Sequence, residues 1–344
     1  MKNITALSVI GVMFLTCLAA FARACDSCAI YTARHARSTG VGSFQVGVAE
    51  RFTRFSGKAE EDGVSGATNS QQYMNSAVTQ FYFNYRATTD LSFQLTLPYI
   101  YRSFRRVSDG TIEKGSLSGI GDLALLVNAD FIKKTFNSSS LSSNLYAGLK
   151  LPTGDSGRLS EEADSDSEPA GNSPAKSLLP SSFKPFITRH GSAENGSLVG
   201  GDDLTPGSGS VDLLIGSNLR YEYQRYFVNT SLQYVLRSEG SYDFRYGNEV
   251  SWSVAPGYMI ALQHSYSASF LLNLSSESKA NDRVNGEKIP LSAHDRIFLG
   301  PSIAFTYGLR WYGEAGLQLP IKSPPDSRGV EPDYRVNAVI NCRF

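Results

Sequence analysis

The chain has 344 residues, no formal net charge and 19 % charged residues, fewer than the roughly 25 % of an ordinary soluble domain. Zero net charge excludes the positively charged surface that nucleic-acid-binding proteins use. After the first two dozen residues, no stretch approaches the roughly 20 apolar residues of a membrane-spanning helix, so a helical membrane protein is excluded too.

Residues 1–24 have the features of a secretory signal peptide. A basic residue stands near the start, an apolar core follows, and Ala22-Arg23-Ala24 is a small-x-small cleavage site. Cleavage there would leave Cys25 as the first residue, which makes a lipid-modified cysteine an alternative, although Ala22 and Arg23 do not fit the lipid-attachment pattern. The segment predicts an exported protein.

From residue 43 onward the hydrophobic pattern has a period of two, which is typical of strands with one apolar and one polar face. In the run 91–102, Leu91 and Phe93 alternate with Ser92 and Gln94. Twelve segments follow this pattern: 43–55, 77–87, 91–103, 120–132, 141–152, 210–222, 226–236, 246–258, 266–275, 296–307, 311–320 and 334–344.

The connections between these segments alternate in length. Long connections follow every odd segment and short ones follow nearly every even segment, as in outer-membrane barrels with short periplasmic turns and long extracellular loops. A soluble sandwich would explain the alternation but neither this rhythm nor the aromatic residues near strand ends. We therefore predict an all-β fold, a single closed antiparallel transmembrane β-barrel over 43–344, with a large extracellular loop at 153–209.

The last segment also alternates and ends on an aromatic residue, Phe344, like the signal that the barrel-assembly machinery reads. An even number of strands places both termini on the periplasmic side. The predicted location is the outer membrane, with its lipid, lipopolysaccharide and the assembly machinery as partners and no nucleic acid.

Four segments carry a resemblance to a known family: SGIGDLALL (118–126), YAGLKLPTGD (146–155), GSGSVDLLIG (207–216) and GLQLP (316–320). Their order resembles that of the outer-membrane transporter barrels named after the meta-cleavage pathway of phenol degradation, over about residues 100–320. The resemblance implies a channel or transporter for small solutes, aromatic ones among them. An insertion after PTGD and an N-terminal CxxC depart from the simplest family pattern.

The same motifs have structural explanations. Proline lacks the backbone donor of a sheet ladder and suits the end of a strand, as at Pro98, Pro152 and Pro320. Glycines at 119–121 and 207–209 permit a bulge or a positive φ where strands begin. A phosphate-binding loop would need a following helix and a lysine, which the pattern does not provide.

Charged residues of both signs alternate onto the inner face of the predicted barrel. Their balance predicts no strong ion preference, and it leaves two interpretations, a narrow mixed-charge pore or a lumen that ion pairs close. Glu50 falls on the lipid face, which predicts a bulge or an earlier end of the first strand. The candidate pore-lining residues are Arg51, Arg86, Arg102, Asp122, Asp130, Lys150, Arg220, Glu249, Glu314 and Arg335.

The tail at 25–42 precedes the first strand and contains Cys25-x-x-Cys28. A disulfide, idle thiols, a redox contact and a weak metal site with His35 are the alternatives. Covalent haem is excluded because Ala29 occupies the place of the histidine in CxxCH, and no cofactor is predicted.

The function we predict is the passage of small solutes through an outer-membrane channel. The alternative is a non-conducting scaffold or surface receptor whose CxxC tail contacts a periplasmic redox or metal-handling partner. We predict no enzyme, because the histidines fall in loops without a nucleophile motif, and only His190 with Asp202 or Asp203 would merit a test. The acidic run 160–168 is either a solvated loop or a calcium site.

Overall fold

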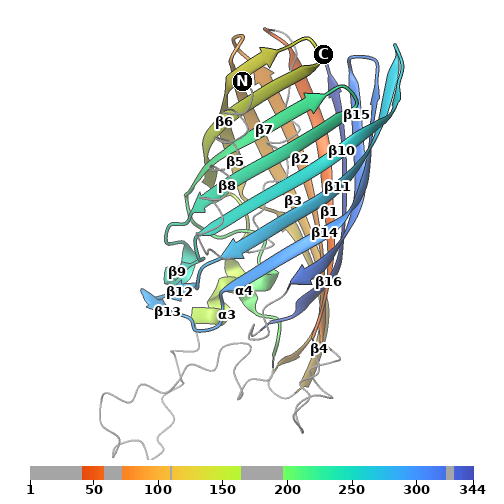
Figure 1. The fold of residues 1–344 in the computed structure, drawn as a ribbon. Coiled ribbons are helices and arrows are strands. Elements are labelled where there is room, and N and C mark those ends of the chain that lie inside the picture. Colours follow the sequence, from red (N-terminus) through yellow and green to blue (C-terminus); the bar gives the residue numbers. More distant parts are fainter. Residues whose placement is uncertain (1–40, 58–71, 109–110, 164–196, 323–328) are drawn as a thin grey trace, which may run out of the picture.

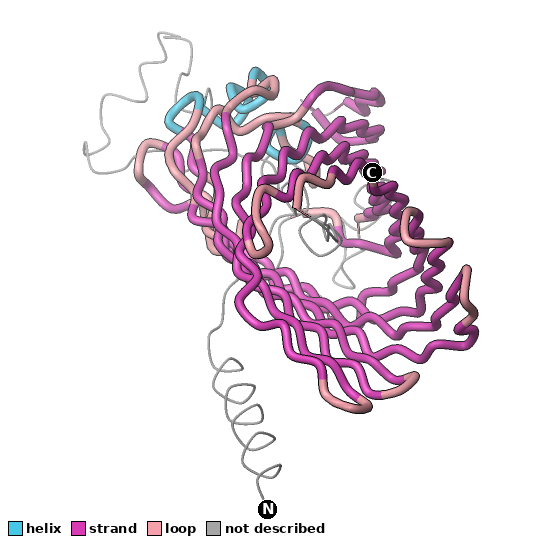
Figure 2. Tube along the Cα trace, turned by 90° about the horizontal axis from the view of Figure 1, so that it is seen from above, coloured by secondary structure: helices cyan, strands magenta, loops and turns pink. Residues whose placement is uncertain are grey.

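The computed structural model describes residues 41–57, 72–108, 111–163, 197–322 and 329–344. Twelve long antiparallel strands form a closed barrel, which Figures 1 and 2 show from the side and from above, and each corresponds to one of the predicted segments. The predicted fold class is therefore confirmed. The strands are β1 (Phe44–Ser56), β2 (Tyr73–Arg86), β3 (Leu91–Ser108), β5 (Leu123–Thr135), β6 (Ser139–Leu151), β7 (Asp212–Tyr223), β8 (Tyr226–Leu236), β10 (Glu249–Leu262), β11 (Tyr266–Lys279), β14 (His294–Tyr307), β15 (Trp311–Lys322) and β16 (Glu331–Arg343).

Closure of the barrel gives hydrogen-bond partners to the backbone groups of its first and last strands. Each strand pairs with its neighbours in chain order, and β1 pairs with β16 along almost its whole length. The register of this pair shifts between Arg54 and Phe55, where β16 has one extra residue, Asp333. Because a closed barrel has no unpaired edge in its wall, it can stand in hydrocarbon.

The two faces of the wall have opposite character. On β2, Phe81 and Phe83 are 49 % and 40 % exposed on the outer surface, whereas Gln80 and Asn84 are 5 % and 0 % exposed on the inner one. An apolar outside around a polar inside is the arrangement of a transmembrane barrel rather than of a soluble sandwich. Among the described residues, no helix is long and apolar enough to cross a membrane.

The connection predicted after residue 103 is mostly strand. β3 continues to Ser108 and pairs with β4 (Thr111–Ile120), and the resulting ribbon projects beyond the barrel (Figure 1). This part of the sequence is rich in glycine and serine, so it lacks the apolar alternation that marks the other strands.

The expectation that proline ends a strand holds at Pro152, which follows β6, and is wrong at Pro98 and Pro320. β3 pairs with β5 as far as Thr96 and with β4 from Tyr99 onward, so Pro98 lies where the partner changes and where no donor is needed. Pro320 lies inside β15, opposite Phe298 and next to an irregularity in the register.

Glu50 does lie on the outer face, but neither predicted reason is correct. β1 runs on regularly past Glu50, and the carboxylate accepts a hydrogen bond from the hydroxyl of Thr79 on the neighbouring strand. This bond between two outward side chains reduces the cost of a carboxylate on an apolar surface.

Loops after β6, β8 and β11 form a cap over the end of the barrel that has the long connections (Figure 1). Leu159, Phe244, Tyr246, Val284 and Ile289 make its small apolar core. Its short elements are η2 (Gly157–Leu159), α3 (Ser160–Ala163), η5 (Ser241–Asp243), β9 (Phe244–Arg245), β12 (Arg283–Val284) and β13 (Glu287–Lys288), and α4 (Gly201–Leu204) belongs to the neighbouring segment 197–210.

A substitution at Phe81 tests the outer face. Phe81 lies opposite Val48 at mid-height of the wall, so Phe81→Arg should destabilise the refolded barrel by about 2–4 kcal/mol, the cost of arginine at the bilayer midplane. The matched control Phe81→Leu stays apolar and should cost less than about 1.5 kcal/mol. Urea unfolding in lipid vesicles measures both, and equal losses would contradict the assignment of the faces.

Candidate functional site in the barrel interior

All ten candidate pore-lining residues lie on the inner side of the wall. The side chains of Lys150, Glu249 and Arg335 are 7 %, 0 % and 1 % exposed, and that of Arg220, near the short turns, is 29 % exposed. Their contacts often join strands that are not neighbours, which is only possible through the interior.

A charge ladder crosses five neighbouring strands at the end with the long connections. The ammonium of Lys150 contacts the carboxylates of Asp122 and Asp212, the latter at 3.0 Å. Arg237 then bridges Asp212 at 2.8 Å and Glu249 at 2.7 Å. The signs alternate along this series (Asp122, Lys150, Asp212, Arg237, Glu249), so each buried charge has a partner of opposite sign.

Three glycine-rich motifs meet beside this ladder. Gly121, Gly154 and Gly207, which we call the glycine junction, approach so closely that a Cβ on Gly154 would lie 2.8 Å from Cα of Gly207 and 3.0 Å from Cα of Gly121. Asp122 secures the junction, because its carboxylate accepts backbone hydrogen bonds from Gly154 and Ser208, both of 3.0 Å. Glycine is required here by close approach of three chain segments.

The segment 197–210, which we call the lid, folds inward over the barrel mouth. Val199 and Leu204 are fully buried in a cluster with Phe55, Met74 and Phe104 from the inner faces of β1, β2 and β3. The lid thus packs against apolar residues at the cap ends of three strands.

Arg102 of β3 binds the lid from the interior of the barrel. Its guanidinium is buried and donates a 2.9 Å hydrogen bond to the backbone carbonyl of Thr205. On the outer side, Tyr246 of the cap donates to the carbonyl of Asp202 at 2.9 Å. The lid is therefore tied both to the wall and to the cap.

The acidic run and the cap share further ion pairs. Glu161 accepts from Arg106 of β3 at 2.8 Å and from Arg158 at 2.7 Å, so this carboxylate is engaged by arginines. In the loop after β11, burial raises the pKa of the Asp282 carboxyl, against the opposing effect of Lys279 at 2.6 Å.

A second charged cluster crosses the interior. Glu277 of β11 accepts two hydrogen bonds from Arg335 of β16, of 2.7 and 2.8 Å, and one of 3.0 Å from Arg51 of β1. The guanidinium of Arg335 also lies over the ring of Phe298, 3.9 Å from its centroid. One carboxylate thereby joins both strands of the closing seam to β11, which lies beyond β14 and β15 in the wall.

Near the short turns, the remaining charges pair locally. Arg86 contacts Asp130 at 2.8 Å, Lys133 contacts the same carboxylate at 3.0 Å, and Arg220 pairs with Glu222. Glu314 accepts hydroxyl hydrogen bonds from Ser302 at 3.0 Å and from Tyr312.

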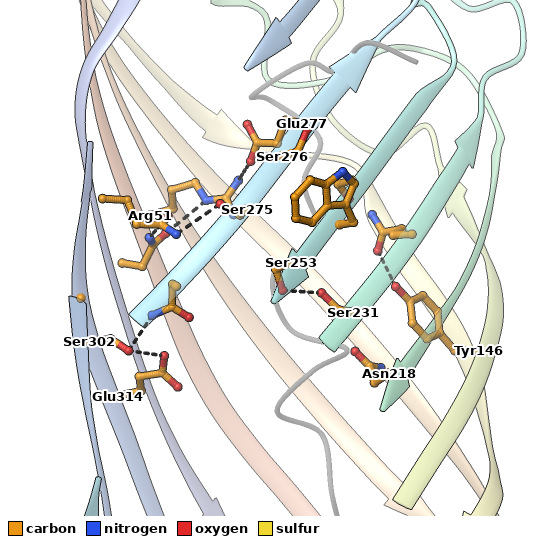
Figure 3. A pocket seen from close by; sticks show the side chains of 17 residues that line it. Arg51, Tyr146, Asn218, Ser231, Ser253, Ser275, Ser276, Glu277, Ser302 and Glu314 are labelled. Carbon is orange, nitrogen blue, oxygen red and sulfur yellow. Dashed lines mark hydrogen bonds and ion pairs between the residues drawn. The ribbon is translucent and has the colours of Figure 1, made fainter. Parts of the chain in front are cut away.

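Between the two ends lies a cavity of about 90 Å³ that Figure 3 shows from close by. Its wall consists mainly of serine, asparagine and glutamine side chains from β7, β8, β10, β11, β14, β15 and β16, with Arg51, Glu277 and Glu314 on one side. Such a surface can exchange hydrogen bonds with a solute or with water.

Sequence reasoning missed Arg237 and Glu277, which hold the two charged clusters together. Both lie just beyond the predicted ends of their strands, at 236 and 275, where the alternation of apolar residues stops. Within the described ranges, no group of three or more His, Cys, Asp or Glu side chains could hold a metal ion. The candidates Cys25, Cys28, His35 and His190 lie outside the described residues.

The last residue, Phe344, is described and continues the closing seam. Its backbone exchanges hydrogen bonds of 2.8 and 3.1 Å with Phe44, and its side chain is 70 % exposed.

No protein-family model and no curated protein matches the sequence. Among solved structures, the COG4313 outer membrane channel from Pseudomonas putida F1 is 14 % identical, with a TM-score of 0.58 over 90 % of this chain and 98 % of that chain. The translocator domain of autotransporter NalP from Neisseria meningitidis (10 % identity, TM-score 0.41, 100 % and 98 % coverage) is more distant. The first likeness shows a shared fold.

Removal of Lys150 tests the charge ladder. Lys150→Met leaves Asp122 and Asp212 without their shared cation in a buried site and should lower stability by about 3–5 kcal/mol. The control Lys133→Met removes a half-exposed ammonium and should change stability little. Urea unfolding measures the stability of both variants. Equal losses would show that Lys150 stabilises the barrel no more than an exposed lysine does.

Proposed function

We propose that the protein is an outer-membrane channel for small solutes. The observation that carries this proposal is a closed barrel with an apolar outer surface and an interior of buried polar and charged side chains. Buried polar groups that the wall does not pair are costly, and water or solute in the lumen would supply their partners. The ten candidate residues then line the path.

Several features support this role and its setting. The solved structure that matches with a TM-score of 0.58 is described as an outer membrane channel, which favours passage over catalysis. The expected signal peptide and the C-terminal Phe344 favour export to the outer membrane with both termini in the periplasm. The meeting of the motifs at Gly121, Gly154 and Gly207 supports membership of the transporter family that they resemble.

A second candidate function is a non-conducting scaffold or surface receptor. The lid favours it, because 197–210 is packed onto three strands and tied to the cap. In this role the tail with Cys25 and Cys28 would contact a periplasmic redox or metal-handling partner.

Planar-bilayer recording separates the two functions. The refolded mature protein, verified as a barrel by its faster migration on gels before boiling, should give discrete and reproducible conductance steps in KCl. Weak ion selectivity should accompany them, because the charges of the interior are mutually paired. Silence from verified barrels would favour the scaffold.

Loss of the Arg102 side chain should loosen the lid. Arg102→Ala removes the hydrogen bond to Thr205 and should raise mean conductance or opening frequency in the same bilayers. Arg105→Ala, an outward residue of the same strand, is the control and should behave like the parent protein. Unchanged conductance in Arg102→Ala would show that the lid does not limit passage.

A further inference from the structure

The cavity of Figure 3 has a wall chemistry that differs from the rest of the interior. Of the described residues that line it, six are serines, three are asparagines and two are glutamines. At about 90 Å³ it has room for several water molecules, or for a small solute with several hydroxyl groups in their place.

The hydroxyl and amide groups are arranged in advance. Ser231 and Ser253 lie opposite one another on β8 and β10 with their Oγ atoms 2.7 Å apart. Asn273 donates to Ser302 at 2.7 Å, and Ser302 donates in turn to Glu314 at 3.0 Å (Figure 3). Fixed donors and acceptors of this kind reward a solute that can both give and take hydrogen bonds.

One acceptor in the wall is unused. Asn218 is 6 % exposed and donates to Asn144 at 2.9 Å, while its Oδ1 has no hydrogen-bond partner within the described part of the chain. A buried acceptor without a donor is costly, but this oxygen has less than 1 Å² of accessible surface, so the amide must turn toward the cavity before a solute hydroxyl can donate to it.

The charges beside the cavity do not select an ion. Arg51 is bound to Glu277, which is also held by Arg335, and Glu314 is engaged by the hydroxyls of Ser302 and Tyr312. Two cations and two carboxylates balance one another, so a net charge on the solute finds no excess of opposite charge here.

We propose that this cavity is the selectivity site of the channel and that it takes small neutral polyhydroxy solutes. The inference rests on the proposed channel function. The hydroxyl groups of a neutral polyol can take the place of water molecules at the serine and amide groups of the wall. An ion would find no counter-charge there, and a hydrocarbon would leave the polar groups of the wall without hydrogen-bond partners.

Swelling of liposomes that contain the refolded protein tests the proposal. Glycerol and erythritol should enter faster than succinate and arginine after subtraction of rates in protein-free liposomes. The double variant Ser231→Val, Ser253→Val should lower both polyol rates about tenfold, the equivalent of one lost hydrogen bond. Thr230→Val, which removes an outward hydroxyl next to Ser231, is the matched control and should keep the parent rates.

The outcomes separate the two proposals. Conductance steps with faster entry of succinate or arginine, or with polyol rates that the double variant does not change, would overturn the inference and leave the channel intact. If verified barrels pass neither ions nor solutes, the channel function fails. Saturation-transfer NMR with erythritol then decides the site alone: a signal that the double variant loses supports it, and no signal overturns it.

Discussion

The ammonium of Lys150 is the interaction on which much of the interior depends. It neutralises Asp122 and Asp212, and each of these carboxylates serves a second purpose. Asp122 binds the backbone of Gly154 and Ser208 and so fixes the glycine junction and the base of the lid. Asp212 binds Arg237 and passes the alternation of charge on to Glu249. The lid, the glycine junction and the barrel wall are therefore held by one network of ion pairs around Lys150.

The interior combines two kinds of polar surface with different consequences. Where charges gather, at the ladder and around Glu277, they are paired at short distance and act as cross-links between strands. Between these clusters, uncharged hydroxyl and amide groups form the wall of the cavity. A lumen of this design gains rigidity from its ions and keeps its hydrogen-bonding capacity for whatever passes through it.

Much of the wall could be predicted from the sequence, because apolar and polar residues that alternate along a strand show directly which side chains face outward and which face inward. Phe81 and Gln80 fall on opposite sides in the pattern and in the structure. The pattern fails in two places: β4 is exposed and shows no apolar alternation, and Arg237 and Glu277 lie where the apolar alternation of their strands stops. The inward fold of the lid depends on packing of Leu204 with residues one hundred or more positions away in the sequence, which no local pattern contains.

The seam between β1 and β16 carries a consequence for assembly. Glu277 on β11 receives Arg51 from the first strand and Arg335 from the last, so all of its ion-pair contacts are made only when the two ends of the chain have met. A barrel open at this seam would keep β11, β14, β15 and β16 as neighbours, and with them the pair of Glu277 and Arg335, but it would lack the guanidinium of Arg51. Joining the first strand to the last is therefore coupled to the completion of this ion-pair cluster. This coupling penalises partly closed intermediates and makes the final step of insertion cooperative.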